Sequence, residues 1–108
     1  MKKQIRYCSS YIPENEIIHN TMYIDGELFV RYYHQKIVPT RYFFSNSGKV
    51  YSEIIRTFIE PEKKRFKGKD GNFYESDIKI IRMYIRINDK TKRVGRKLES
   101  IINTLFNK

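Results

Sequence analysis

This chain has 108 residues, of which 40% are hydrophobic and 15% aromatic, and its formal net charge is +10 at pH 7. The length suits one domain with a modest core, and the apolar content excludes a wholly disordered chain. No run approaches the roughly 20 apolar residues of a membrane-spanning helix, and the single Cys8 excludes an intrachain disulfide and a cysteine metal site. We therefore expect one domain over residues 1–108, in the cytoplasm, or in the host cytoplasm if the source is viral.

The positive charge is concentrated in the second part of the chain. Residues 1–40 carry five Lys and Arg against four Asp and Glu, whereas residues 41–108 carry seventeen against eight, a net charge of +9. Such a field favours a polyanionic partner. Nucleic acid is the first candidate, followed by an acidic protein or an anionic membrane surface. A lysine-rich solvated surface, typical of proteins encoded by AT-rich genomes, is the alternative.

The apolar residues favour strands. Ile, Tyr and Phe dominate, there are only three Leu, and Ala is absent, so the composition suits a sheet with little helix. In chain order, residues 4–12 are a possible first strand. Asp25-Gly26 lies between two aromatic and β-branched runs, which is the strongest short-range signal of a tight turn between antiparallel strands. It predicts strands at 21–24 and 27–33.

A second turn is predicted at Ser45-Asn46-Ser47-Gly48, because Ser and Asn bond their own backbone in turns and Gly48 adopts positive φ without strain. The remaining predicted elements are strands near 41–45 and 49–59, a basic stretch at 60–71 that is a loop or the end of a long hairpin, a strand within 72–87, and a turn at 88–90.

The last residues have the pattern of a helix. Leu98, Ile101, Ile102, Leu105 and Phe106 recur at the spacing of one helical face, which predicts a helix from about 96 to 106 that starts near Gly95. Together these elements predict an α+β fold, in which a small antiparallel sheet of hairpins packs one face on a C-terminal amphipathic helix.

The sequence contains no recognisable catalytic constellation. His19 and His34 have no cysteine partners, Glu14 and Glu16 flank a loop, and no residue near Cys8 clearly lowers its pKa. We therefore expect no enzymatic activity, no cofactor and no metal.

Basic segments are the stronger functional signal. Two clusters, within residues 63–69 and 90–97, would form a stripe able to neutralise several phosphates if they fold onto one face; solvated loop rims are the alternative. Asn46 suits a base edge, because its amide can pair bidentately with adenine. The predicted phosphate contacts are Lys49, Arg56, Lys63, Lys64, Arg65, Lys67, Arg93, Arg96 and Lys97.

Residues 42–52, YFFSNSGKVYS, carry a known pattern at eight positions: Tyr42, Phe44, Ser45, Asn46, Gly48, Lys49, Val50 and Ser52. They resemble the small DNA-binding motif found beside HNH homing endonucleases, mostly in phages, with the core Tyr-x-Val-Ser-Asn-x-Gly-Arg-Val-x-Ser. Residues 93–108 are more weakly similar to the basic segment and helix that precede the nuclease core, with Gly95 in place of a His. The usual Gly-Tyr-Glu-Gly lead-in is replaced by IVPTR.

This resemblance implies a DNA-binding module without its nuclease, because no His-Asn-His set follows to hold a metal. The sequence thus predicts a small basic nucleic-acid-binding protein that prefers DNA to RNA and does not bind membranes, with a phage as the candidate source. The alternative is a non-enzymatic interaction subunit of a virion or ribonucleoprotein particle with an acidic protein partner, or a phage inhibitor of a host protein.

Overall fold

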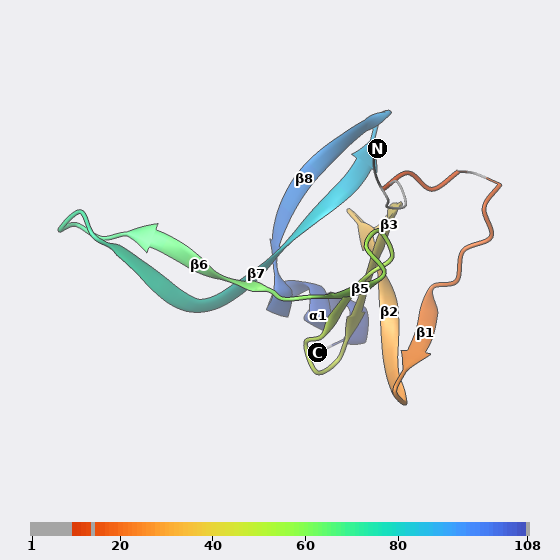
Figure 1. The fold of residues 1–108 in the computed structure, drawn as a ribbon, viewed down its shortest axis with the longest axis horizontal. Coiled ribbons are helices and arrows are strands. Elements are labelled where there is room, and N and C mark those ends of the chain that lie inside the picture. The colour runs from red at the N-terminus through yellow and green to blue at the C-terminus, as the bar shows by residue number, and fades with distance from the viewer. Residues whose placement is uncertain (1–9, 14, 108) are drawn as a thin grey trace, which may run out of the picture.

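The computed structural model describes residues 10–13 and 15–107, which form eight strands and one helix (Figure 1). All strand pairings are antiparallel, so the predicted α+β class with one C-terminal helix is confirmed. The elements are β1 (Thr21–Ile24), β2 (Glu27–His34), β3 (Val38–Ser45), β4 (Val50–Ser52), β5 (Thr57–Ile59), β6 (Glu62–Lys67), β7 (Phe73–Ile87), β8 (Lys90–Lys97) and α1 (Leu98–Phe106).

The strands are divided between two sheets, whereas the sequence predicted one. Strands β1 to β5 form the first sheet in chain order, and β6, β7 and β8 form the second. Pro61 lies in the short connection between them. Since proline has no amide hydrogen to donate to a strand ladder, it favours the end of the first sheet at this point.

Local turn chemistry explains several element boundaries. Asp25 and Gly26 have φ values of 50° and 80°, the left-handed pair that a two-residue turn between antiparallel strands requires. The predicted strands on either side, 21–24 and 27–33, are present as β1 and β2. The predicted strand at 49–59 is instead interrupted, because the chain turns at 53–56 and Arg56 has a φ of 58°.

Other predicted boundaries are shifted. The basic stretch predicted as a loop or the end of a hairpin contains β6, which pairs with β7. The helix begins at Leu98 rather than near 96, since β8 continues to Lys97, and Gly95 lies inside that strand. Of the possible first strand at 4–12, residues 4–9 lie outside the described residues and residues 10–12 are not in a strand.

The core joins the two sheets and the helix. Buried apolar side chains come from β3, from the second half of β7 and from one side of α1, where Leu98, Ile101 and Ile102 are buried. The hydroxyl of Tyr42 in β3 also accepts a hydrogen bond from the backbone amide of Tyr84 in β7, at 2.9 Å. Within the described residues, no helix has both the length and the apolar character needed to cross a membrane.

Candidate nucleic-acid interface

Strand β6 and the first half of β7 form a two-stranded ribbon that projects from the body of the molecule, which we call the arm (Figure 1). Every residue of β6 is exposed. Strand β6 therefore makes little contact with the core. Its side chains are available to stabilise the arm itself or to contact a partner.

The tip of the arm is an ordered turn. The amide of Gly68 donates to the carbonyl of Asn72 at 2.8 Å, and the amide of Gly71 donates back to the carbonyl of Gly68 at 3.0 Å. Gly71 has a φ of 87°, as expected of a three-residue turn that ends in a left-handed glycine. The Asp70 carboxylate accepts hydrogen bonds from the Tyr74 hydroxyl and from Asn72, and these bonds lower the pKa of Asp70.

The two faces of the arm differ in chemistry. Residues directly opposite each other in antiparallel strands share a face, so Phe66 lies with Tyr74, and their rings stack at 5.9 Å between centroids. The opposite face carries Arg65 beside Glu75 and Lys67 beside Phe73. The arm thus presents cations next to exposed aromatic rings.

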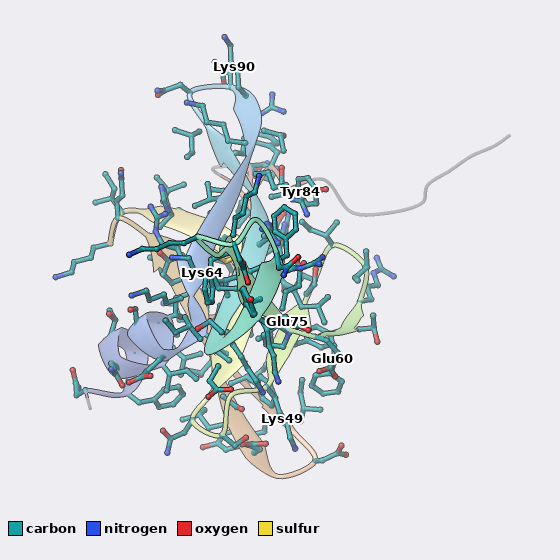
Figure 2. The ribbon with its side chains drawn as sticks, turned by 90° about the vertical axis from the view of Figure 1, so that its left-hand side faces the viewer. Lys49, Glu60, Lys64, Glu75, Tyr84 and Lys90 are labelled. Carbon is teal, nitrogen blue, oxygen red and sulfur yellow. The ribbon has the colours of Figure 1, made fainter. Side chains whose placement is uncertain are left out.

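Four predicted phosphate contacts, Lys63, Lys64, Arg65 and Lys67, come together on β6. Among the described residues none of the four is in an ion pair. Lys64 and Glu75 of the arm are labelled in Figure 2, together with Tyr84, in a view from the side of the arm. These cations remain available to an anionic partner.

The turn between β3 and β4 holds the next two predicted residues. Asn46 is exposed, as a contact to a base edge requires. Lys49, however, is in an ion pair with Glu27 at 3.2 Å. Ser47 also donates a hydrogen bond to Glu27, and these contacts lower the pKa of that carboxyl group. The positive charge of Lys49, which we predicted to contact a phosphate, is therefore balanced by Glu27 within the protein.

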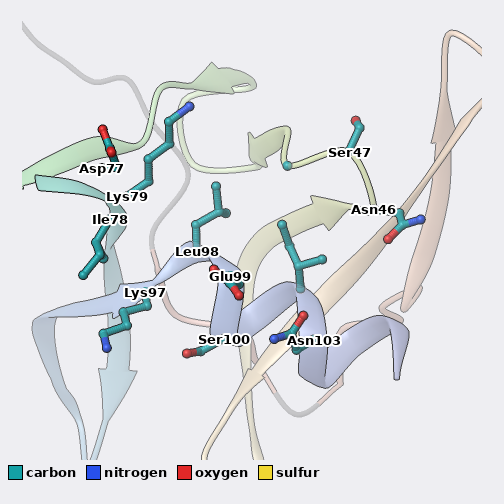
Figure 3. Close-up of a pocket in the computed structure, with 12 residues that line it drawn as sticks. Asn46, Ser47, Asp77, Ile78, Lys79, Lys97, Leu98, Glu99, Ser100 and Asn103 are labelled. Carbon is teal, nitrogen blue, oxygen red and sulfur yellow. The ribbon is translucent and has the colours of Figure 1, made fainter. Parts of the chain in front are cut away.

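A pocket of about 850 Å³ lies beside this turn, between the β3–β4 turn, the start of α1 and a segment of β7 (Figure 3). It brings Asn46 and Lys97 to one cavity, although they are far apart in sequence, and adds Lys79. Asp77 and Glu99 also line it, so the charges of the cavity wall are mixed.

The last three predicted phosphate contacts lie on β8, where they point to two different faces of the second sheet. Arg93 and Lys97 lie opposite Tyr84 and Ile80, on one face of the second sheet. Arg96 lies opposite the buried Ile81 and therefore projects from the other face. The cations of the cluster at 90–97 are thus divided between two faces, because side chains alternate between the faces of a strand.

The predicted contacts do not form one continuous surface. Arg56 belongs to the turn between β4 and β5, in the first sheet. Lys49 lies at the opposite end of the molecule from Lys90, the first residue of β8 (Figure 2). The arm and the β7–β8 face share β7 and form one connected sheet.

Tyr84 and Arg82 are surface residues that the sequence reasoning missed. Both belong to the period-2 pattern of residues 80–86, whose even members face outward while Ile81, Met83 and Ile85 are buried. This alternation is the sequence signal that could have identified Arg82 and Tyr84 as surface residues. It identifies them only once the strand is known to have one exposed face.

The described residues contain no group of three His, Cys, Asp or Glu side chains arranged to hold a metal. His34 is buried, and its Nδ1 has no hydrogen-bond partner. Burial and the nearby charge of Arg96 lower the pKa of His34. We assign it to the protein interior rather than to a site.

No protein-family model matches this chain, and no curated protein or solved structure is similar to it. The resemblance of residues 42–52 to the HNH-associated motif consequently stays a prediction.

Proposed function

We propose that this chain is a small nucleic-acid-binding protein that grips DNA mainly with its arm. The observation that carries the proposal is the concentration of four unpaired cations on β6, a strand whose residues are all exposed. Cations on a projecting element can reach phosphates without first breaking ion pairs inside the protein.

The shape of the arm favours duplex DNA over duplex RNA. The major groove of B-form DNA admits a two-stranded ribbon, and the arm has that cross-section. The major groove of A-form RNA is deep and narrow, and side chains cannot read it. The preference for DNA in our proposal rests on this difference.

The proposal gives the β3–β4 hairpin a smaller role than the motif resemblance implies. Asn46 remains the candidate for a base contact, whereas Lys49 would have to leave Glu27 to bind a phosphate. The amphipathic C-terminal helix supports the hairpins through its buried face. We propose a non-enzymatic DNA-binding module that acts in the cytoplasm, with a phage as its candidate source and the host cytoplasm as its place of action in that case.

Charge reversal on the arm tests the proposal. Lys64→Glu/Lys67→Glu should weaken binding to a labelled duplex by at least about tenfold in fluorescence anisotropy at low salt. Lys36→Glu/Lys90→Glu is the control, because it changes the net charge equally at two exposed turn-proximal positions outside the arm. Equal losses in both variants would show that only overall charge matters. Unchanged affinity in a folded arm variant would contradict the proposal.

A second candidate function is favoured by the exposed rings of the arm. Phe66, Phe73 and Tyr74 are each at least two-fifths exposed, and aromatic side chains are enriched at protein interfaces. The chain would then be an interaction subunit of a virion or ribonucleoprotein particle, or an inhibitor of a host protein. Binding to a protein partner that is lost with Phe66→Ser, without any affinity for DNA, would favour this function.

A further inference from the structure

The face of the second sheet that points away from the core has a regular arrangement. We call it the outer face, and define it by three residues of β7 and three of β8: Arg82, Tyr84, Arg86, Arg93, Gly95 and Lys97. Arg82 lies opposite Gly95, and Tyr84 lies opposite Arg93. None of the six is acidic, although Glu62 shares this face because it lies opposite Ile80. The six residues therefore give the face a net positive charge, with one aromatic ring at its centre.

Tyr84 is held as a platform. The residue is 51% exposed, while its backbone is fixed on both sides. Strand β8 pairs with it along one edge, and the buried Tyr42 hydroxyl accepts its amide hydrogen on the other edge at 2.9 Å. A ring on a fixed backbone loses little conformational entropy when a second ring stacks on it.

Gly95 leaves open space beside this ring. It is the diagonal neighbour of Tyr84 across the strand pair, a position that an aromatic side chain can reach. A Cβ atom added at Gly95 would meet nothing within 4 Å. Its φ also lies outside the left-handed region, so the backbone does not require glycine here. The missing side chain leaves the face free for a flat group.

The charges around the ring suit a phosphate backbone. Arg93 and Lys97 have no ion pair among the described residues, and Arg82 is paired only with the exposed Glu62, at 2.7 Å. Arg86 lies over the ring of Tyr11, with 5.7 Å between its guanidinium carbon and the ring centre. Two free cations thus lie on the β8 side of the Tyr84 ring.

We infer that the outer face binds unpaired nucleotides, with one base stacked on Tyr84 above Gly95 and the backbone along Arg93 and Lys97. This inference rests on the proposed function and names a second substrate class for it. A base inside a duplex already stacks on its neighbours and hides its faces, whereas a single strand can place a base against an aromatic ring. The arm and the outer face together would suit nucleic acid in which a duplex adjoins a single-stranded segment.

The test uses a labelled oligothymidylate and a labelled oligouridylate, each of about 10 nucleotides, and a labelled duplex. Tyr84→Ala should weaken binding to the single strands by roughly 5- to 150-fold and change duplex binding little. Tyr84→Phe should retain binding to the single strands, because it keeps the ring. Tyr23→Ala is the matched control, since Tyr23 is an exposed strand tyrosine of the first sheet. Comparing the two oligonucleotides distinguishes DNA from RNA as the source of the strand.

Gly95→Val gives an independent test without removing any contact. Valine suits a strand and has room in the free protein, but its methyl groups would occupy the place of the base. It should reduce binding to single strands as Tyr84→Ala does, while thermal unfolding confirms the fold.

The outcomes separate the two proposals. Losses in Tyr84→Ala and Gly95→Val, with binding retained in Tyr84→Phe and Tyr23→Ala, support the outer-face site. Unchanged binding to single strands in both variants overturns it, while the arm remains supported if Lys64→Glu/Lys67→Glu still loses the duplex. A folded wild-type protein that binds none of the three probes at low salt overturns both.

Discussion

Arg31 is a cation that the protein keeps for its own structure. Its side chain is 2% exposed and donates to Glu53 at 3.0 Å and to the carbonyl of Thr40 at 2.6 Å, while its guanidinium carbon lies 4.4 Å from the ring centre of Phe43. A buried charge persists when its hydrogen-bonding groups have partners. Part of the positive charge of the chain is therefore not available to a partner, because Arg31 is buried and paired within the protein.

His34 is a buried histidine from which we predict a dependence of stability on pH. Burial and the charge of Arg96 lower its pKa in the folded state below the ordinary value of 6.5, and the ring of Tyr32 lies 6.5 Å away. As the pH falls below 6.5, the unfolded chain binds a proton that folded His34 does not. The free energy of unfolding should therefore keep the full contribution of neutral His34 above pH 6.5 and decrease as the pH falls below that value. This group contributes a slope of up to about 1.4 kcal/mol per pH unit.

Urea denaturation between pH 7.5 and 5 measures this slope. His34→Gln should reduce it, whereas His19→Gln, at an exposed position, should keep it. An identical slope in wild type and His34→Gln would show that other groups cause the dependence.

At the scale of elements, the arm is a unit of its own. It has the ladder between β6 and β7, the stacked Phe66–Tyr74 pair and an ordered tip, but no buried residue in β6. Elements with little buried surface open locally without unfolding the core. Changes in the arm should therefore affect its own order and not the stability of the whole protein.

Gly71→Ala tests this independence. The left-handed φ of 87° at Gly71 costs a residue with a Cβ about 1–2 kcal/mol, and nothing lies within 4 Å of that atom. Amide hydrogen exchange should accelerate in β6 and the first half of β7, with little change in β3 and α1. Gly95→Ala should leave exchange in the arm unchanged, because its φ needs no glycine. Faster exchange throughout the protein after Gly71→Ala would show that the arm and core open together.

The element scale also shows how far the sequence could predict this fold. Asp25-Gly26 and the spacing of Leu98, Ile101 and Ile102 act locally, and they predicted β1, β2 and the C-terminal helix closely. The division into two sheets depends on pairings between distant residues, which local patterns do not encode. The same limit applies to the site, because Glu27 of β2 meets Lys49 of the β3–β4 turn only when β2 pairs with β3.

At the scale of the whole molecule, the described residues carry their positive charge on several surfaces, but the exposed cations without an ion pair among these residues lie mainly on the second sheet. The arm and the outer face belong to this sheet and share β7. The first sheet pairs several of its cations with Glu16, Glu27 and Glu53. The division into two sheets thus separates a supporting unit from a proposed binding unit.

The salt dependence of duplex binding tests the role of the arm most directly. Four cations of β6 on four phosphates predict that the logarithm of the association constant falls against the logarithm of salt concentration with a slope of roughly −4. Lys64→Glu/Lys67→Glu should reduce that slope by about 2, and Lys36→Glu/Lys90→Glu should leave it near the wild-type value. A folded wild-type protein with no measurable duplex binding at low salt would contradict the proposed role of the arm, and so would a slope that Lys64→Glu/Lys67→Glu does not change.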